Sequence, residues 1–217
     1  MRRIIPPLIF GILGCAVLIS LGVWQLRRLE WKESVLAEIE MRIASAPVPL
    51  EEAEAEYAPV TLSGEITGPA LRFIYSGTEE DIVAAVQTEA GRRVIVDLGL
   101  VPARPMASAP PELPEGRVEI TGNLVMPVGR GGTLHLDQSN AWAARELGNL
   151  AEVLGAEPVF VVARQIEPTI PGLTPLPVSA EGIPNNHFGY AIQWFGIALV
   201  WAGMSLYLIR RTLRAKD

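Results

Sequence analysis

The sequence predicts a membrane protein, a two-helix transmembrane hairpin with an extracytoplasmic β-rich domain inserted between the helices. Two apolar runs, 4–26 and 187–209, lie near the ends of the chain. The first contains no charged residue, and the second contains none after His187. Each run can cross a hydrocarbon core about 30 Å thick, and a span in lipid must satisfy its backbone hydrogen bonds as a helix. Short β-branched segments between turn residues fill the middle of the chain. They predict an antiparallel sheet or a small barrel of the α+β class.

The distribution of charge predicts the orientation of the hairpin. The predicted tails, 1–3 and 210–217, hold six of the 18 Lys and Arg residues but only one, Asp217, of the 24 Asp and Glu residues. Because cationic flanks favour the cytoplasm, both termini are expected there, and residues 27–186 are expected to form a periplasmic domain. This domain is strongly acidic, which argues against nucleic acid as a partner.

The N-terminal run also bears on the compartment. It begins at residue 4, which leaves no room for a mitochondrial transit peptide, so a bacterial inner membrane is expected. A cleaved signal peptide is the alternative, but the run lacks an Ala-x-Ala-like site and continues into a helical pattern. The single cysteine, Cys15, lies within this run, so the chain cannot build a disulfide framework, a zinc site or a CxxC redox pair from it.

The middle of the chain is predicted to contain a helical extension, six strands and one helix. Helical spacing continues from the first span to about residue 44, and Pro47 and Pro49 end it. The strand segments are 60–66, 71–75, 82–87, 93–101, 117–125 and 159–163. Residues 141–154 are predicted to form a helix that ends at Gly155, with one apolar stripe made of Leu147, Leu150 and Leu154.

Catalytic constellations are missing from the sequence of this domain. Its only histidine, His135, follows a glycine-rich run, 129–132, that lacks the Gly-Lys-Ser ending of a phosphate-binding loop. No second histidine or cysteine in the domain offers a metal partner, so His135 is interpreted as a loop histidine. We therefore expect no enzyme activity.

The second apolar run has two distinct faces at 100° per residue. Glycines recur every seven residues on one face, at Gly189, Gly196 and Gly203. Small residues let helices approach closely in lipid, so this face is predicted to pack against another helix. The opposite face carries a polar and aromatic stripe made of His187, Tyr190, Ala191, Trp194, Ala198 and Trp201.

The first run divides in the same way, and two arrangements of the pair remain open. Its small-residue face holds Gly11, Cys15 and Gly22, and the opposite face holds Trp24, Arg28 and Trp31. If the two small-residue faces pack together, His187 and Arg28 project to opposite sides of the hairpin. If the helices are rotated instead, Trp24, Arg27 or Arg28 can close over whatever His187 binds.

His187 is the first residue of the second predicted span, where an ionisable group suggests a functional site. Imidazole is a common ligand of metals and of haem iron. The simpler interpretation is structural: Asn186 caps the helix, His187 is a polar residue of its first turn, and Arg27 and Arg28 snorkel to the interface beside a belt of aromatic residues. The residues alone do not decide between the two.

Two longer motifs resemble the Surfeit locus protein 1 (Shy-type) family. Residues 22–28 read Gly-Val-Trp-Gln-Leu-Arg-Arg, followed by Trp31-Lys32, and residues 185–195 read Asn-Asn-His-Phe-Gly-Tyr-Ala-Ile-Gln-Trp-Phe. The segment 94–102 is similar to a family strand that usually reads V-N-R-G-W-V-P. Here Asp97, Leu98 and Leu100 replace its Asn, Arg and Trp, which makes a ligand role for this strand doubtful.

The resemblance implies a function in assembly of the haem-copper cytochrome c oxidase, with haem a bound transiently and passed to subunit I. It makes His187 the ligand of the haem iron, and it makes subunit I, haem a synthase and membrane lipid the expected partners. Two alternatives are an assembly scaffold that holds no haem and a membrane-anchored enzyme. The other motif positions carried over to the expected haem site are Trp24, Gln25, Arg28, Tyr190, Gln193 and Trp194.

Overall fold

The chain forms two compact units. The computed structural model describes residues 5–74, 78–103, 113–126, 141–142, 146–180 and 183–214. Met1–Glu38 and Ala180–Asp217 make up the first unit, and Ile39–Ser179 makes up the second. We refer to them as the helical unit and the barrel unit.

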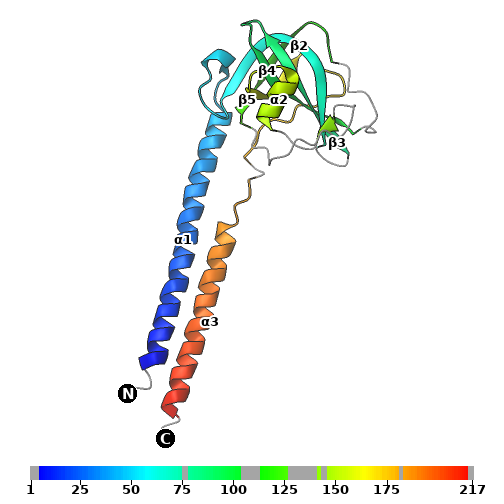
Figure 1. The fold of residues 1–217 in the computed structure, drawn as a ribbon. Helices are drawn as coiled ribbons and strands as arrows, with labels where there is room; N and C mark the ends of the chain where they lie inside the picture. The colour runs from blue at the N-terminus through cyan, green and yellow to red at the C-terminus, as the bar shows by residue number, and fades with distance from the viewer. Residues whose placement is uncertain are drawn as a thin grey trace. The chain divides into compact units, whose positions relative to one another are not determined.

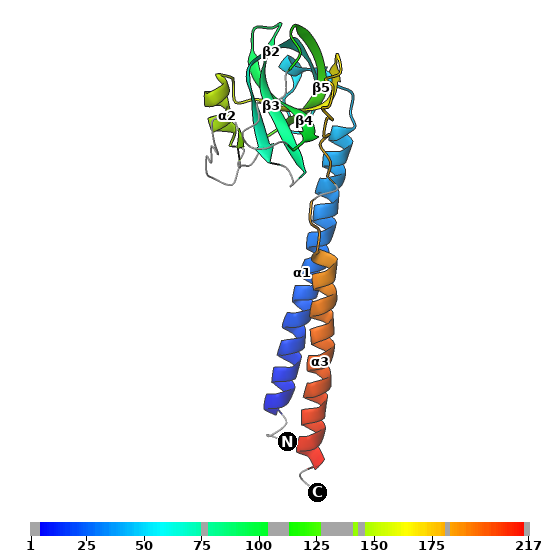
Figure 2. The ribbon, with the colours of Figure 1, turned by 90° about the vertical axis from the view of Figure 1, so that its right-hand side faces the viewer.

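Two long helices make up the described part of the helical unit. Helix α1 spans Ile5–Ile43, of which the last turn belongs to the barrel unit, and helix α3 spans His187–Arg214. The two helices lie side by side and run antiparallel, so that both chain termini lie at the same end of the pair (Figures 1 and 2). Both are long and apolar enough to cross a bilayer, judged by length and composition. The prediction that the first helix continues to about residue 44 is confirmed.

The helices approach each other over the small-residue face of α1. A Cβ added at Gly11 or Gly22 would lie 2.8 Å from Ser205 or 2.6 Å from Phe195, respectively. The tightest point is Gly14, where an added Cβ would lie 2.1 Å from Nε1 of Trp201. Glycine in α1 therefore provides the space into which the larger side chains of α3 pack.

The prediction for the glycine face of α3 was wrong. A Cβ added at Gly189, Gly196 or Gly203 would meet nothing within 4 Å, so this face points away from α1. The buried residues of α3 are instead Ala191 and Ala198, 1% and 7% exposed. Since α1 already supplies the glycines, close approach needs no glycine on α3, and alanine is small enough at its closest points.

The barrel unit is built on a sheet that closes on itself. The neighbour order is β1-β2-β3-β4-β7-β5, with β5 also paired to β2 and β6 paired to β2 off this path. The predicted small barrel is thus confirmed. The elements are β1 Val48–Pro49, η1 Leu50–Glu52, β2 Pro59–Ile74, β3 Glu79–Thr88, β4 Arg93–Pro102, β5 Arg117–Val125, β6 Ala141–Trp142, α2 Leu147–Leu154 and β7 Phe160–Glu167.

Two details of the predicted sheet need correction. The sheet is not purely antiparallel, because β7 runs parallel to β4, and the short strands β1 and β6 run parallel to β2. The segments 60–66 and 71–75 are not two strands, because β2 continues through a bulge between Thr67 and Leu71. Gly68, at φ +80°, and Pro69 lie in this bulge, where the ladder is interrupted and proline removes no pairing hydrogen bond.

The predicted helix 141–154 is also shorter in the structure. Helix α2 covers only its second half, while Ala141–Trp142 pairs with Arg72 and Phe73 of β2. Pairing with a strand overrides the modest helix propensity of so short a segment. The apolar stripe is correct, since Leu150 and Leu154 are 1% and 2% exposed, and Gly155 ends the helix in a left-handed conformation.

Two layers of apolar side chains stabilise the barrel unit. Leu150 and Leu154 pack onto one layer, which lies between α2 and the outside of the sheet and includes Phe73, Ile95 and Phe160. The other layer contains side chains from β2, β3, β4, β5 and β7 around the barrel, among them Val60, Val86, Val96, Val118 and Val161.

A charged pair is buried in this unit as well. The Arg72 guanidinium donates to both carboxylate oxygens of Glu80, with N–O distances of 2.9 and 2.6 Å. The side chain of Arg72 is 1% exposed and that of Glu80 is 8% exposed. Because both ions are desolvated, each depends on the charge of the other.

Candidate functional site

A hydrogen bond joins the first residue of α3 to α1. Nδ1 of His187 lies 2.8 Å from Oε1 of Gln25, whose side chain is buried at 8% exposure. An amide oxygen can only accept, so in a neutral imidazole this contact corresponds to the tautomer with the proton on Nδ1 and the lone pair on Nε2. Two turns further along α1, Lys32 Nζ donates to the carbonyl of Pro184. These two bonds fix the start of α3 against α1.

His187 is half-buried, and no hydrogen bond to Nε2 is found among the described residues. The described part of the chain also holds no group of three or more His, Cys, Asp or Glu residues that could bind a metal ion. A metal held here would therefore have one imidazole ligand from the described residues.

The side chains around His187 are arranged on one flank of the helix pair. A contact nearer the chain termini defines this flank: the rings of Phe10 on α1 and Trp201 on α3 have centroids 4.9 Å apart. At about 100° per residue, Arg28 projects at the angle of Phe10, and Trp24 at about 40° from it. Tyr190 and Trp194 project at about 20° from Trp201. We call Trp24, Arg28, Tyr190 and Trp194 the aromatic flank.

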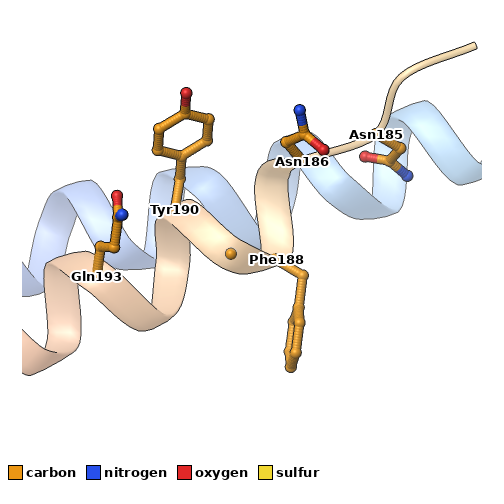
Figure 3. A pocket seen from close by; sticks show the side chains of 6 residues that line it. Asn185, Asn186, Phe188, Tyr190 and Gln193 are labelled. Atoms are coloured by element: carbon orange, nitrogen blue, oxygen red, sulfur yellow. The ribbon is translucent and has the colours of Figure 1, made fainter.

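The close-up view shows the directions of four side chains at the start of α3 (Figure 3). Tyr190, Gln193 and Asn186 point to one side of α3, and Phe188 points to the other (Figure 3). Phe195 packs over Gly22 on the side opposite the aromatic flank. We call the line along which α1 and α3 are closest, marked by the buried Gly22, Gln25 and Ala191, the seam. His187 projects between the seam and the aromatic flank, at about 40° from Trp201.

Of the two helix arrangements left open by the sequence, the structure has the rotated one. His187 and Arg28 lie on the same flank, so the arrangement that separates them is wrong. Arg27 projects away from α3, at about 200° from Gln25. The residues expected at the site are thus brought to one end of one flank, with Gln25 in the seam and Gln193 at the outer edge of α3.

The cation of this flank is held by an aromatic ring. The guanidinium carbon of Arg28 lies 3.8 Å from the centre of the Trp31 ring, within the range of a cation–π contact. The aromatic side chains themselves are open: Trp24, Trp31 and Tyr190 are 54%, 50% and 51% exposed. The flank therefore offers apolar surface and one oriented positive charge, but no enclosed cavity.

An open hollow of about 500 Å³ lies at the start of α3, and His187 is not among the residues that line it (Figure 3). Tyr190 and Gln193 were identified from the sequence, and the other lining residues were not assigned to a site. Those four are Asn185, Asn186, Phe188 and Gly189. The sequence signal for them was their place in the second motif. Lys32, which holds the chain before α3, was also missed as a structural contact, because no sequence pattern pairs it with Pro184.

Two sequence features lie outside the described residues. His135 and the glycine run 129–132 fall in the part of the chain that the structure does not describe. Their interpretation as a loop stays a prediction.

The strand that departs from the family pattern lies in the barrel unit. Asp97, on β4, is 4% exposed. Burial raises the pKa of its carboxyl to about 7, and a hydrogen bond from the backbone of Gly99 opposes that rise. A protonated carboxyl resembles the amide of the usual asparagine in shape, so the strand keeps its packing without a buried full charge at low pH.

Comparison with known proteins agrees with these motifs. The family model described as SURF1 family matches residues 12–199. Surfeit locus protein 1 of Xenopus tropicalis is 29% identical over 205 residues, which cover 81% of this chain and 66% of that protein. The human protein of the same name is 26% identical over 206 residues (81% and 68%), and a SURF1-like protein of Monosiga brevicollis is 28% identical over 207 residues (82% and 78%). The chain spans about two thirds of the length of these vertebrate relatives. It belongs to the SURF1 family.

Proposed function

We propose that the protein is a membrane-bound assembly factor of the haem-copper cytochrome c oxidase, which holds haem a as cargo and helps to insert it into subunit I. Family membership supports the assembly role. The observation that carries the haem proposal is His187, whose Nδ1 is bonded to Gln25 so that Nε2 is left as an iron ligand.

The other side chains of the aromatic flank suit a haem. Trp24, Tyr190 and Trp194 offer ring surface to a macrocycle, and Arg28, oriented by Trp31, offers a cation to a propionate. One protein ligand and an open flank suit a carrier, because the cargo must leave for an acceptor that binds it more tightly. The protein itself performs no turnover in this proposal.

The proposed setting is a bacterial inner membrane. The two apolar helices support a hairpin with both termini in the cytoplasm and the barrel unit in the periplasm, as the cationic tails favour. His187 then lies at the outer end of a span, near the level of the headgroups. A hydrophobic tail on the cargo can remain in lipid while its propionates meet Arg28.

The test is the absorption spectrum and extracted haem of the full chain, purified in detergent from cells that also express the enzymes of haem a synthesis. We expect a Soret band and haem a in the wild-type protein, and loss of most of both in His187→Ala. His135→Ala removes the only other histidine and should keep the haem. Equal haem content in His187→Ala and the wild type would contradict the assignment of His187.

The exposed aromatic flank also supports a second candidate, a scaffold that holds no haem. Trp24, Trp31 and Tyr190 are half exposed and could contact a membrane helix of subunit I or of haem a synthase. The scaffold predicts that the detergent-purified protein retains oxidase subunits but contains no stoichiometric haem, and that His187→Ala leaves this retention unchanged.

A further inference from the structure

We propose that Gln25 is a positioning residue: it holds His187 in the Nδ1–H tautomer, with Nε2 as the donor atom, and does not itself contact the cargo. The proposal differs from the sequence interpretation, in which Gln25 was one of the haem contacts. Its ligand part rests on the proposed function, whereas the tautomer is a property of the protein without haem.

The geometry supports a fixed acceptor. The Nδ1–Oε1 distance is 2.8 Å, and the Gln25 side chain, 8% exposed, is enclosed where the helices are closest. The preceding turn of α1 carries Gly22, which allows Phe195 to pack closely, and the next two turns end at Lys32, whose bond to Pro184 holds the entry to α3. The amide therefore has little freedom to leave the imidazole.

The chemistry of the acceptor also has a consequence. Histidines that bind metals usually donate the other ring N–H to an oxygen, and this second bond fixes the tautomer and the direction of the ligand atom. A carboxylate in that position makes the imidazole a stronger donor. A neutral amide orients the ring with less effect on donor strength, which suits a protein that must release the haem it carries.

The reverse hydrogen bond, with Gln25 as the donor, predicts the other tautomer of His187. If the amide nitrogen of Gln25 donated to Nδ1, Nε2 of His187 would carry the ring proton and could not bind iron while neutral. Nitrogen NMR separates the two states, because protonated and unprotonated ring nitrogens of a neutral imidazole have widely different chemical shifts.

The experiment uses the haem-free full chain in detergent micelles, labelled with ¹⁵N-histidine, in a His135→Ala background so that His187 gives the only signal. The pH is kept well above the ordinary imidazole pKa of about 6.5. We expect a protonated Nδ1 and an unprotonated Nε2. Gln25→Met, which keeps the size but removes the acceptor, should give a mixture of tautomers, and Gln25→Glu should restore the Nδ1–H form.

Gln193→Met is the matched control, because it removes an amide from α3 outside the seam. It should leave the His187 nitrogen shifts unchanged. An unprotonated Nδ1 in the wild type, or shifts unaffected by Gln25→Met, would overturn the proposal.

Titration with ferric haem b then separates this proposal from the proposed function. Loss of the acceptor should weaken haem binding about 10- to 100-fold in Gln25→Met, whereas Gln25→Glu should retain it. Equal haem affinity of Gln25→Met and the wild type would overturn the positioning role. If the wild type has the expected tautomer but binds neither haem b in titration nor haem a in cells, the haem function fails and the hydrogen-bond assignment remains.

Discussion

At the scale of single residues, the barrel unit changes the pKa of one buried carboxyl, that of Asp97. Its pKa rises from 3.8 to about 7 on folding because the carboxyl is buried. The folded state therefore holds its proton more tightly than the unfolded state, and the stability gained from this is lost as the pH rises from about 4 to about 7. Above pH 7 the folded protein must contain a buried carboxylate.

We expect Asp97→Asn to stabilise the barrel unit at pH 8, by up to about 4 kcal/mol, since one pKa unit corresponds to about 1.4 kcal/mol. At pH 4 the two proteins should differ far less. The measurement is urea unfolding of the full chain at several pH values. Glu119→Gln, at an exposed position of β5, is the control and should leave the pH dependence unchanged. A stability difference between Asp97→Asn and the wild type that does not grow between pH 4 and pH 8 would contradict the assignment.

The sequence identified Asp97 only as a departure from a family strand. It also predicted that 93–101 is a strand, from its β-branched residues and the proline that follows. What it could not give was the side of the sheet on which the carboxyl lies, since the bulge between Ile82 and Val83 shifts the register of β3 against β4.

At the scale of elements, the packing of α1 against α3 distinguishes glycines that need their small size from glycines that do not. Gly14 lies under the indole of Trp201, whereas Gly196 on α3 has open space around it. Gly14→Ala should weaken the helix pair by about 1–3 kcal/mol through overpacking, and Gly196→Ala should not. Both changes alter helix propensity by the same amount, so the comparison isolates the packing.

A disulfide can report this difference. The Cys15 thiol lies 3.9 Å from the carbonyl oxygen of Ala198, so Ala198→Cys places two thiols across the pair. The effective concentration of the two thiols, measured in a glutathione buffer in detergent, should fall about tenfold or more with Gly14→Ala, because 1.4 kcal/mol is a factor of ten. A similar fall with Gly196→Ala would show that the glycine-rich face of α3 also packs.

Elements with a strong period were predictable, and their partners were not. The bounds of β5 and the apolar stripe of α2 follow from alternation and helical spacing. The rotation of α3 does not follow, because a glycine face and an alanine face are both small enough to approach α1. The choice depends on Phe195 and Trp201 fitting over particular glycines of α1, which is a property of the assembled pair.

The site shows the same limit at the scale of the whole molecule. Motifs around residues 25 and 187 were recognisable separately. Only an antiparallel pair in a specific register brings Gln25 level with His187, and only the rotation places Arg28 on the flank of Tyr190. The sequence therefore predicted which residues could form the site, whereas the positioning role proposed for Gln25 depends on its contact with His187 in the assembled pair.

The division into two compact units predicts that they respond separately to mutation. Glu80→Gln leaves Arg72 buried without its full countercharge and should destabilise the barrel unit by about 3 kcal/mol or more. Replacing both residues by methionine should cost less, because neither member of this pair is then left buried without the other. In detergent, urea should unfold the barrel unit while the helices persist, which far-UV circular dichroism can follow as loss of strand signal with helix signal retained. Glu80→Gln should shift the strand transition alone, and Gly14→Ala should leave that transition in place. A common shift of both signals by either variant would mean that the units unfold as one cooperative structure.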